Sequence, residues 1–302
     1  MISHEFINIL VTLTLVEMMI AIGLRVPLAD VILAARNWRR LTRALAANYL
    51  LVPAAALLLA EFLVDSQALV VGFLIVAAFP GASFGPPFTT FARGDLSLAV
   101  GLMVLLAASS AVVGPVLLRL MLQWTSVPTS ITVDVPRVIG LLALTQLAPL
   151  SAGIIVRQFA PRIAARLRDP AELLSKVLNG CSIGCILVDH WQQPGESHFA
   201  GLWAMLALLV VSLVAGYLMG GPGDSSRKTV ALATSLRNIG VSVVVASSHQ
   251  VGSAALAAVI GYAIIEITGS FILAIWWGRM DTRRRFMSAS SAASSVSRGG
   301  QI

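Results

Sequence analysis

The segment ALATSLRNIGVSVVVA, residues 231–246, is apolar enough to cross a membrane, yet it carries an arginine, Arg237, near its centre. An arginine at the middle of a bilayer costs about 3 to 10 kcal/mol unless it has a partner or faces a water-filled cavity. Polar or flexible residues surround it, namely Ser235, Asn238 and Gly240. We therefore predict that the helix of this span is broken here and that Arg237 belongs to a functional site.

The composition of the whole chain is that of an integral membrane protein. Of its 302 residues, 57% are hydrophobic and 12% are charged, whereas about a quarter of the residues of a soluble domain are charged. Apolar runs of the length needed to cross a hydrocarbon core recur along the chain. We predict an all-α integral membrane fold with nine transmembrane helices, at residues 6–24, 44–63, 68–91, 96–121, 136–157, 171–191, 200–220, 228–248 and 252–278.

The basic residues predict how the chain is oriented. Of the 21 Lys and Arg residues, 18 lie in the segments 25–43, 92–95, 157–176, 224–228 and 279–298. The positive-inside rule places these segments in the cytoplasm, so the N-terminus is outside and the C-terminus is cytoplasmic, as in a multi-pass protein of the cell (inner) membrane. Because anionic lipid accounts for the basic loops, the net charge of +7 predicts no nucleic-acid partner. Residues 283–302, rich in Ser, Ala and Gly, are expected to form a disordered cytoplasmic tail.

A second span also has the composition of a broken helix. Residues 79–87 read FPGASFGPP, with three prolines and two glycines, and proline removes backbone donors from a helix. Each interrupted span is followed by one long span, the last of its half of the chain. In the predicted topology the two interrupted spans cross the membrane in opposite directions. This predicts a single transporter domain over 1–302 with an inverted repeat, about 6–121 and about 136–278. Interrupted spans in matching positions point to a transporter's binding site, although Pro and Gly also mark kinks and close helix packing.

Three segments resemble the bile acid:sodium symporter family. The run PGASFGPPFTTFARGDLSLAV, residues 80–100, is similar to the family segment in which a Pro-Gly-Gly-Thr-Ala-Ser-Asn-like stretch leads into a Lys/Arg-Gly-Asp turn. Residues 237–240, RNIG, align with the Gln-Asn-Ser-Gly of the family's second crossing helix, and Asn48 before Pro53 resembles a glutamine before a proline. The resemblance implies a panel domain, a core domain with two crossing broken helices, and organic-anion substrates such as bile acids, sulfated steroids and small carboxylates.

The chain departs from this family where the sodium ligands should be. By the resemblance, the Ser-Asn pair that binds sodium aligns with Gly85 and Pro86, the sodium-binding glutamate with Ala233, and the glutamine with Arg237. Sites for such hard cations are built from oxygen ligands that usually include a carboxylate, so we expect no sodium coupling and a fixed positive charge on Arg237 instead. Ser109 and Ser110 on the following helix keep a rearranged sodium site open.

Three roles are open for Arg237. It can pair with an acid inside the membrane, for which Glu266 is preferred over Glu17; it can bind the carboxylate or sulfonate of an organic anion; or it can serve a gate or a proton-linked step. An unpaired Glu266 or Glu17 is a candidate proton carrier. The candidate substrate-binding residues are Asn48, Ser83, Gly85, Pro86, Ser235, Arg237, Asn238 and Gly240, and the candidate ion-coupling residues are Glu17, Ser109, Ser110 and Glu266.

The favoured function is secondary transport of a small organic anion by alternating access. The alternatives are a sodium-coupled symporter with rearranged ligands, a metalloid or small-anion efflux carrier, and a non-transporting membrane sensor. Neither broken segment contains a cysteine, which disfavours the metalloid carrier, and the HExxH and GxSxG motifs of enzymes are missing. We expect no enzyme activity, metal or cofactor, a proton as a possible coupling ion, and membrane lipid and the substrate as partners; the sequence leaves the oligomeric state undetermined.

Overall fold

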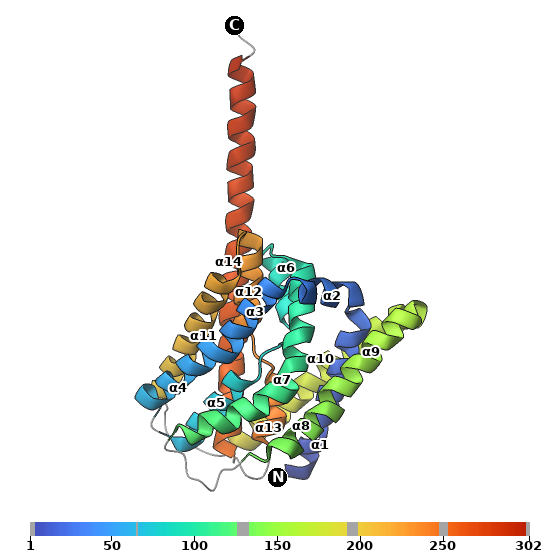
Figure 1. Ribbon diagram of the computed structural model, residues 1–302, viewed down its shortest axis with the longest axis vertical. Coiled ribbons are helices and arrows are strands. Elements are labelled where there is room, and N and C mark those ends of the chain that lie inside the picture. Colours follow the sequence, from blue (N-terminus) through green and yellow to red (C-terminus); the bar gives the residue numbers. More distant parts are fainter. Residues whose placement is uncertain (1–3, 65, 126–132, 192–198, 248–252, 300–302) are drawn as a thin grey trace.

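The computed structural model describes residues 4–64, 66–125, 133–191, 199–247 and 253–299. Within these residues the fold is built from helices and has no extended strand (Figure 1). The first half contains α1 (His4–Arg25), α2 (Leu28–Arg36), α3 (Trp38–Ala46), η1 (Ala47–Leu51), α4 (Val52–Leu63), α5 (Gln67–Ala78), α6 (Gly85–Phe91) and α7 (Leu96–Gln123). The second half contains α8 (Val135–Leu142), η2 (Ala143–Leu147), α9 (Ala148–Phe159), α10 (Pro161–Trp191), α11 (Phe199–Met219), α12 (Asp224–Ser235), α13 (Ile239–Ala246) and α14 (Ser253–Gly299).

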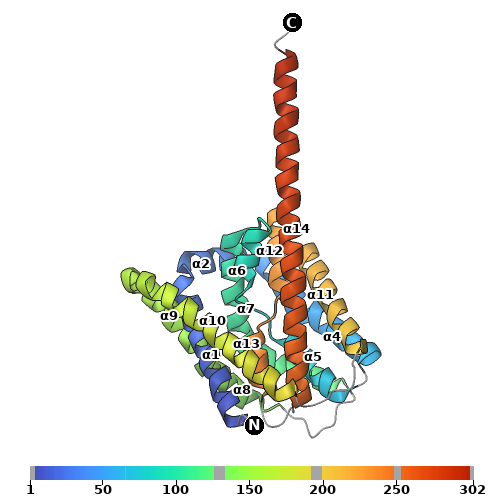
Figure 2. The ribbon, with the colours of Figure 1, turned by 180° about the vertical axis from the view of Figure 1, so that it is seen from behind.

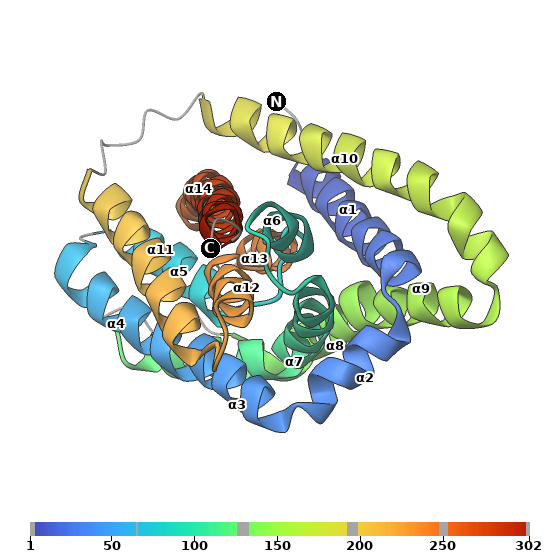
Figure 3. The same ribbon diagram turned by 90° about the horizontal axis from the view of Figure 1, so that it is seen from above.

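The helices form two groups that lie side by side. Seen from above, α1, α9 and α10 make one wall, while α5, α6, α7, α12, α13 and α14 are gathered in the middle, with α4 and α11 beyond them (Figure 3). The view from behind shows α10 running across the front of the molecule, with α1 behind it (Figure 2). The two ends of the chain lie at opposite ends of the structure (Figure 1).

Both predicted helix interruptions are confirmed. The third predicted span is divided into α5 and α6 by residues 79–84, and the eighth into α12 and α13 by residues 236–238. Proline explains the first break, since Pro80 lies two residues after the end of α5 and α6 begins with a glycine and two prolines. Asn238 explains the restart of the second, because its side-chain oxygen accepts the Val241 N–H as the N-cap of α13.

The nine-span count stays a prediction. Among the described residues, five helical stretches are long and apolar enough to cross a membrane: Trp38–Leu63, Leu96–Gln123, Val135–Phe159, Gly201–Met219 and Ala255–Thr282. A sixth is reached if α1 and α2, bent by 84°, count as one span. The two broken spans fail this test for a physical reason: a half-helix of 12 residues, such as α5 or α12, is about 18 Å long and cannot cross a core of about 30 Å alone.

The α1 and α9 helices cross with their backbones in contact. Each has a glycine at the crossing, and a Cβ added to either Gly23 or Gly153 would lie 2.8 Å from the Cα of the other. Helices approach this closely only where the side chain is absent. On its other side, α1 is joined to α10 by the Thr14–Ser182 hydrogen bond, 2.9 Å, and by the ion pair of Arg25 and Glu172.

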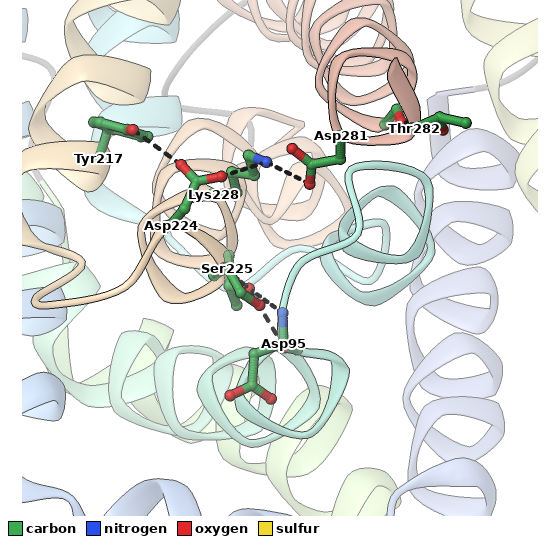
Figure 4. Close-up of polar contacts among 9 residues, drawn as sticks. Asp95, Tyr217, Asp224, Ser225, Lys228, Asp281 and Thr282 are labelled. Carbon is green, nitrogen blue, oxygen red and sulfur yellow. Dashed lines mark hydrogen bonds and ion pairs between the residues drawn. The ribbon is translucent and has the colours of Figure 1, made fainter. Parts of the chain in front are cut away.

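Polar contacts hold together the end of the molecule from which α14 projects (Figure 4). The ammonium group of Lys228, on a side chain that is 4% exposed, lies between Asp224 at 2.6 Å and Asp281 of α14 at 2.8 Å. The hydroxyl of Thr229, one residue further along α12, accepts the backbone N–H of Asp95 at 2.8 Å. Helix α12 is therefore tied to both α14 and the turn before α7.

The C-terminal segment 283–302 is expected from its composition to be a disordered tail, and this stays a prediction. Helix α14 runs to Gly299, and its last part projects away from the other helices (Figure 1).

Candidate site at the crossing of the broken helices

The two interruptions meet at one point in the middle of the molecule. Pro80 and Arg237 pair as in an antiparallel bridge, and the Asn238 N–H donates to the Phe79 carbonyl at 2.8 Å. Gly81 follows with φ +104°, and a Cβ there would lie 2.4 Å from a backbone nitrogen of α7. Only glycine adopts this conformation in so little space. The sequence FPGAS therefore positions the first broken segment against both the second one and α7.

The guanidinium of Arg237 binds the ends of both half-helices. Its Nε donates to the Val76 carbonyl at 3.2 Å and its Nη2 to the Ala77 carbonyl, both in the last turn of α5. Its Nη1 donates to Oδ1 of Asn48 at 2.7 Å and to the Thr234 carbonyl of α12 at 3.4 Å. Helix C-termini have carbonyls without intrahelical partners and carry a partial negative charge. One buried cation, 1% exposed, therefore satisfies two broken helices at once.

Glu266 contacts Arg237 in a different way from the one predicted. Its Oε2 accepts the backbone N–H of Arg237 at 3.0 Å. No ion pair joins its carboxylate to the guanidinium in the part of the chain that the structure describes. The expected side-chain salt bridge is replaced because the guanidinium turns towards the freed carbonyls. Oε1 of Glu266 is buried and has no hydrogen-bond partner among the described residues.

The other ion-coupling candidates, Glu17 on α1 and the neighbouring Ser109 and Ser110 on α7, make no hydrogen bond to Arg237 among the described residues. Glu17 lies on α1, where its Oε2 accepts the hydroxyl of Ser175 of α10. Ser109 is hydrogen-bonded to the Tyr49 hydroxyl at 2.7 Å, and Ser110 donates to the Ala107 carbonyl of its own helix at 2.8 Å. Neither serine hydroxyl is grouped with a carboxylate.

A cavity of about 320 Å³ lies between the crossing and the wall formed by α1 and α10. Its walls are mainly apolar, and its polar lining comes from Thr14, Ser83, Ser182, Asn238 and Thr268, with Arg237 at the back. Nδ2 of Asn238 is buried and unpartnered within the described residues, and the residue is 2% exposed. An apolar pocket with a few polar groups is the usual form of a small-molecule site.

The structure divides the predicted substrate-binding residues into two sets. Ser83, Arg237, Asn238 and Gly240 line the cavity. The other four lie outside its lining: Asn48 under the guanidinium, Ser235 against Ser270 at 3.1 Å, and Gly85 and Pro86 buried at the start of α6.

One buried polar residue, Gln146, was missed in the sequence. Gln146, fully buried in the π-helical turn η2, donates to the Ala107 carbonyl of α7 and so links the two helix groups. Asn48 lies in the corresponding turn η1, and a proline follows each turn closely, Pro149 and Pro53. A polar residue shortly before a proline in an apolar span is the signal in the sequence, and Gln146 before Pro149 has it as clearly as Asn48 before Pro53. π-helical turns are frequent at functional sites.

Three known proteins are similar in sequence to this chain over most of its length. The chain is 21% identical over 282 residues to the probable sodium/metabolite cotransporter BASS3 of Arabidopsis thaliana chloroplasts, covering 91% of the chain and 64% of that protein. It is 22% identical to the Oryza sativa protein of the same name, covering 91% and 66%. It is 24% identical over 254 residues to the uncharacterized sodium-dependent transporter YocS of Bacillus subtilis, covering 81% and 75%. The chain thus spans slightly less than two thirds of the length of the two plant relatives.

The family comparison covers most of the chain. Residues 12–215 match the family described as the Sodium Bile acid symporter family. This range includes the first broken helix, most of α11 and most of the cavity wall on α1 and α10. With several helices long enough to cross a membrane, the chain is an integral multi-pass membrane protein, and it belongs to the sodium bile acid symporter family.

Proposed function

We propose that this protein is a secondary transporter of a small organic anion, that it works by alternating access, and that Arg237 replaces a coupling sodium ion. One observation carries the proposal: the buried guanidinium donates to carbonyls of both α5 and α12 and to Asn48. Unwound carbonyls and half-helix C-termini are the groups that coordinate sodium in broken-helix transporters. Here these acceptors already have a cation that cannot dissociate.

The helix order supports an inverted repeat with nine spans. In the first half a long helix is followed by the α3–α4 stretch, the broken pair α5–α6 and the long α7; in the second, α10 is followed by α11, the broken pair α12–α13 and the long α14. We propose that α1, α8, α9 and α10 form the panel and that the remaining helices form the core. With its basic loops in the cytoplasm, the chain would have its N-terminus outside and its C-terminus inside the cell membrane.

The substrate is proposed to bind in the cavity between panel and core. The guanidinium already donates four hydrogen bonds within the protein, so its positive charge would act on the anion at a distance rather than through a bidentate contact. Direct hydrogen bonds come from neutral groups, chiefly Nδ2 of Asn238 and the hydroxyls of Ser83 and Thr268. The apolar walls from α1, α13 and α14 favour a substrate with an apolar body and one anionic group.

Sodium binding to the purified protein tests the fixed cation. A ligand that binds the folded state raises its stability by RT ln(1 + [L]/Kd), so a sodium site gives a saturable rise in melting temperature. At constant ionic strength, with choline replacing sodium, the wild type is expected to show no such rise. Arg237→Gln, which removes the charge, is expected to be less stable, and any sodium response should appear only in this variant. A saturable rise in the wild type would mean that it is a sodium symporter with rearranged ligands.

Uptake into proteoliposomes then separates a carrier from a sensor. Labelled organic anions of three kinds, a steroid carboxylate, a sulfonate and a short keto acid, are offered on one side of the membrane. A carrier accumulates substrate beyond its binding stoichiometry, and Asn238→Ala should lower the apparent affinity for the transported anion. Uptake that never exceeds binding for any anion would favour the sensor.

Proton coupling at Glu266 is a second candidate for the driving force. It is favoured by the buried Oε1, which lacks a hydrogen-bond partner among the described residues, and by the position of this acid beside the crossing. Ionisable residues buried in a transporter often mark proton pathways. An inward proton gradient should then drive uptake in the absence of sodium, and a protonophore should abolish it.

A further inference from the structure

A second pocket, of about 470 Å³, lies outside the transport site at the elbow between α2 and α3. Its lining comes from the end of α2, the start of α3 and the first turn of α7. The elbow is formed by Asn37, whose side chain caps α3 by accepting the Arg40 N–H. Residues of α2, α3 and α7 therefore build this pocket, and none of the residues at the helix crossing belongs to its lining.

The charge of this elbow pocket is strongly positive. Arg36, Arg39 and Arg40 line it, and within the described parts of the chain none of their guanidinium groups has a carboxylate oxygen within 4 Å. The acid of the lining, Asp95, is engaged in capping α7, because its Oδ1 accepts the Leu98 N–H at 3.0 Å. The Arg39 guanidinium lies over the Trp38 ring, 5.6 Å from its centroid. Three guanidinium groups without a carboxylate partner among the described residues attract a phosphate, which arginine binds in a bidentate manner.

The surroundings of the pocket are those of a membrane surface. Helix α2 turns by 84° from the axis of α1, so it lies across the end of a helix that enters the membrane. Leu33 and Trp38, beside the arginines, are 62% and 63% exposed, and Ile32 is 45% exposed. Tryptophan and exposed aliphatic side chains next to basic residues are typical of helices that lie in the headgroup region.

We propose that the elbow pocket binds the phosphate of an anionic phospholipid, with an acyl chain against Leu33 and Trp38. The arginines alone would also suit free inorganic phosphate, but that ion gains nothing from exposed apolar side chains. Under the predicted topology the pocket faces the cytoplasmic leaflet, where anionic lipids attract basic residues. A bound lipid would bridge α2, α3 and α7.

The test uses the purified full chain and compares two pairs of arginines. Arg36→Gln/Arg39→Gln removes two charges from the pocket. The control, Arg162→Gln/Arg166→Gln, removes two exposed charges from the start of α10, outside the pocket lining. Native mass spectrometry and lipid-dependent melting temperature are measured with phosphatidylglycerol, phosphatidylcholine and inorganic phosphate. Both variants are first compared with the wild type without added lipid, so that a folding defect is recognised.

The expected result is saturable binding of phosphatidylglycerol, weakened at least about tenfold by the pocket variant and less than about twofold by the control. Phosphatidylcholine should bind much more weakly. An equal loss in both variants would overturn the proposal in favour of unspecific attraction to basic loops. Equal stabilisation by inorganic phosphate at the same concentration would also overturn it, because the site would then take the free ion.

Discussion

Replacing Asn48 by leucine tests whether the guanidinium of Arg237 is held by the protein as described. Asn48 is fully buried; its Oδ1 accepts from Arg237 at 2.7 Å, and its Nδ2 donates to the Thr234 hydroxyl at 3.2 Å. Leucine has a similar volume, so packing changes little while both contacts are lost, together with the bond from Nδ2 to the Ala44 carbonyl one turn earlier, 2.9 Å. Nη1 of Arg237 would then keep only the Thr234 carbonyl at 3.4 Å.

The loss of stability in Asn48→Leu can be estimated from the contacts of Asn48 to Arg237 and to Thr234. A hydrogen bond to a charged group contributes about 1.5 to 3 kcal/mol. A neutral hydrogen bond between membrane helices contributes about 0.6 kcal/mol on average. Asn48→Leu should therefore lower the free energy of unfolding by about 2 to 4 kcal/mol.

The assay is reversible unfolding in mixed detergent micelles, followed by circular dichroism. The matched control is Tyr49→Phe at the next position, which removes the 2.7 Å bond to Ser109 but no hydrogen bond of Arg237, and should cost about 1 kcal/mol or less. A double-mutant cycle of Asn48→Leu with Arg237→Met should give a coupling energy of about 1.5 kcal/mol or more. Additive effects in this cycle, or equal costs for Asn48→Leu and Tyr49→Phe, would refute the reasoning.

Three further changes probe other parts of the structure. Gly81→Ala should cost more than about 3 kcal/mol and prevent accumulation of folded protein, because φ is +104° and the new Cβ would meet α7; Gly140→Ala, where no atom lies within 4 Å of the added Cβ, should be tolerated in the same expression and thermal-stability assays. Lys228→Met leaves two carboxylates without their cation and should lower the unfolding free energy by about 1 to 3 kcal/mol, measured in detergent micelles; an unchanged value would show that this contact contributes nothing. Glu266→Gln keeps an acceptor for the Arg237 N–H, so the fold should persist while proton-driven uptake in proteoliposomes is lost; uptake still driven by a proton gradient would exclude this acid as the carrier.

The main features of the fold could be predicted from local sequence chemistry. Prolines and glycines in 79–87 and polar residues in 235–240 predicted both breaks correctly, because such residues act within a few positions of where they occur. The contact between the two breaks, and the cavity beside them, depend on helices that are distant in sequence. That the two broken helices cross each other could be expected only from the resemblance to a known family.

The partner of Arg237 could not be predicted from the residue types alone. The sequence offers Glu266 as the obvious counterion, but a broken helix also frees backbone carbonyls, which do not show in a sequence. Four acceptors around the guanidinium, three of them carbonyls, outweigh one carboxylate that is placed to accept the backbone N–H. Gln146 was missed for a related reason, since a π-helical turn changes which face of the span a residue occupies.

The glycine crossing of α1 and α9 limits which helices can slide along α1. At Gly23 and Gly153 backbone meets backbone with no intervening side chain, so a shift by one residue along either helix would bring a side chain into the contact. On the cavity side, α1 instead faces Gly240 through the flexible end of Met18, 3.1 Å from where a Cβ would be. Methionine side chains adapt readily to a moving neighbour. In the transport cycle proposed above, the glycine crossing would stay fixed, and the sliding that opens the cavity to either side would occur at the interface between α1 and α13.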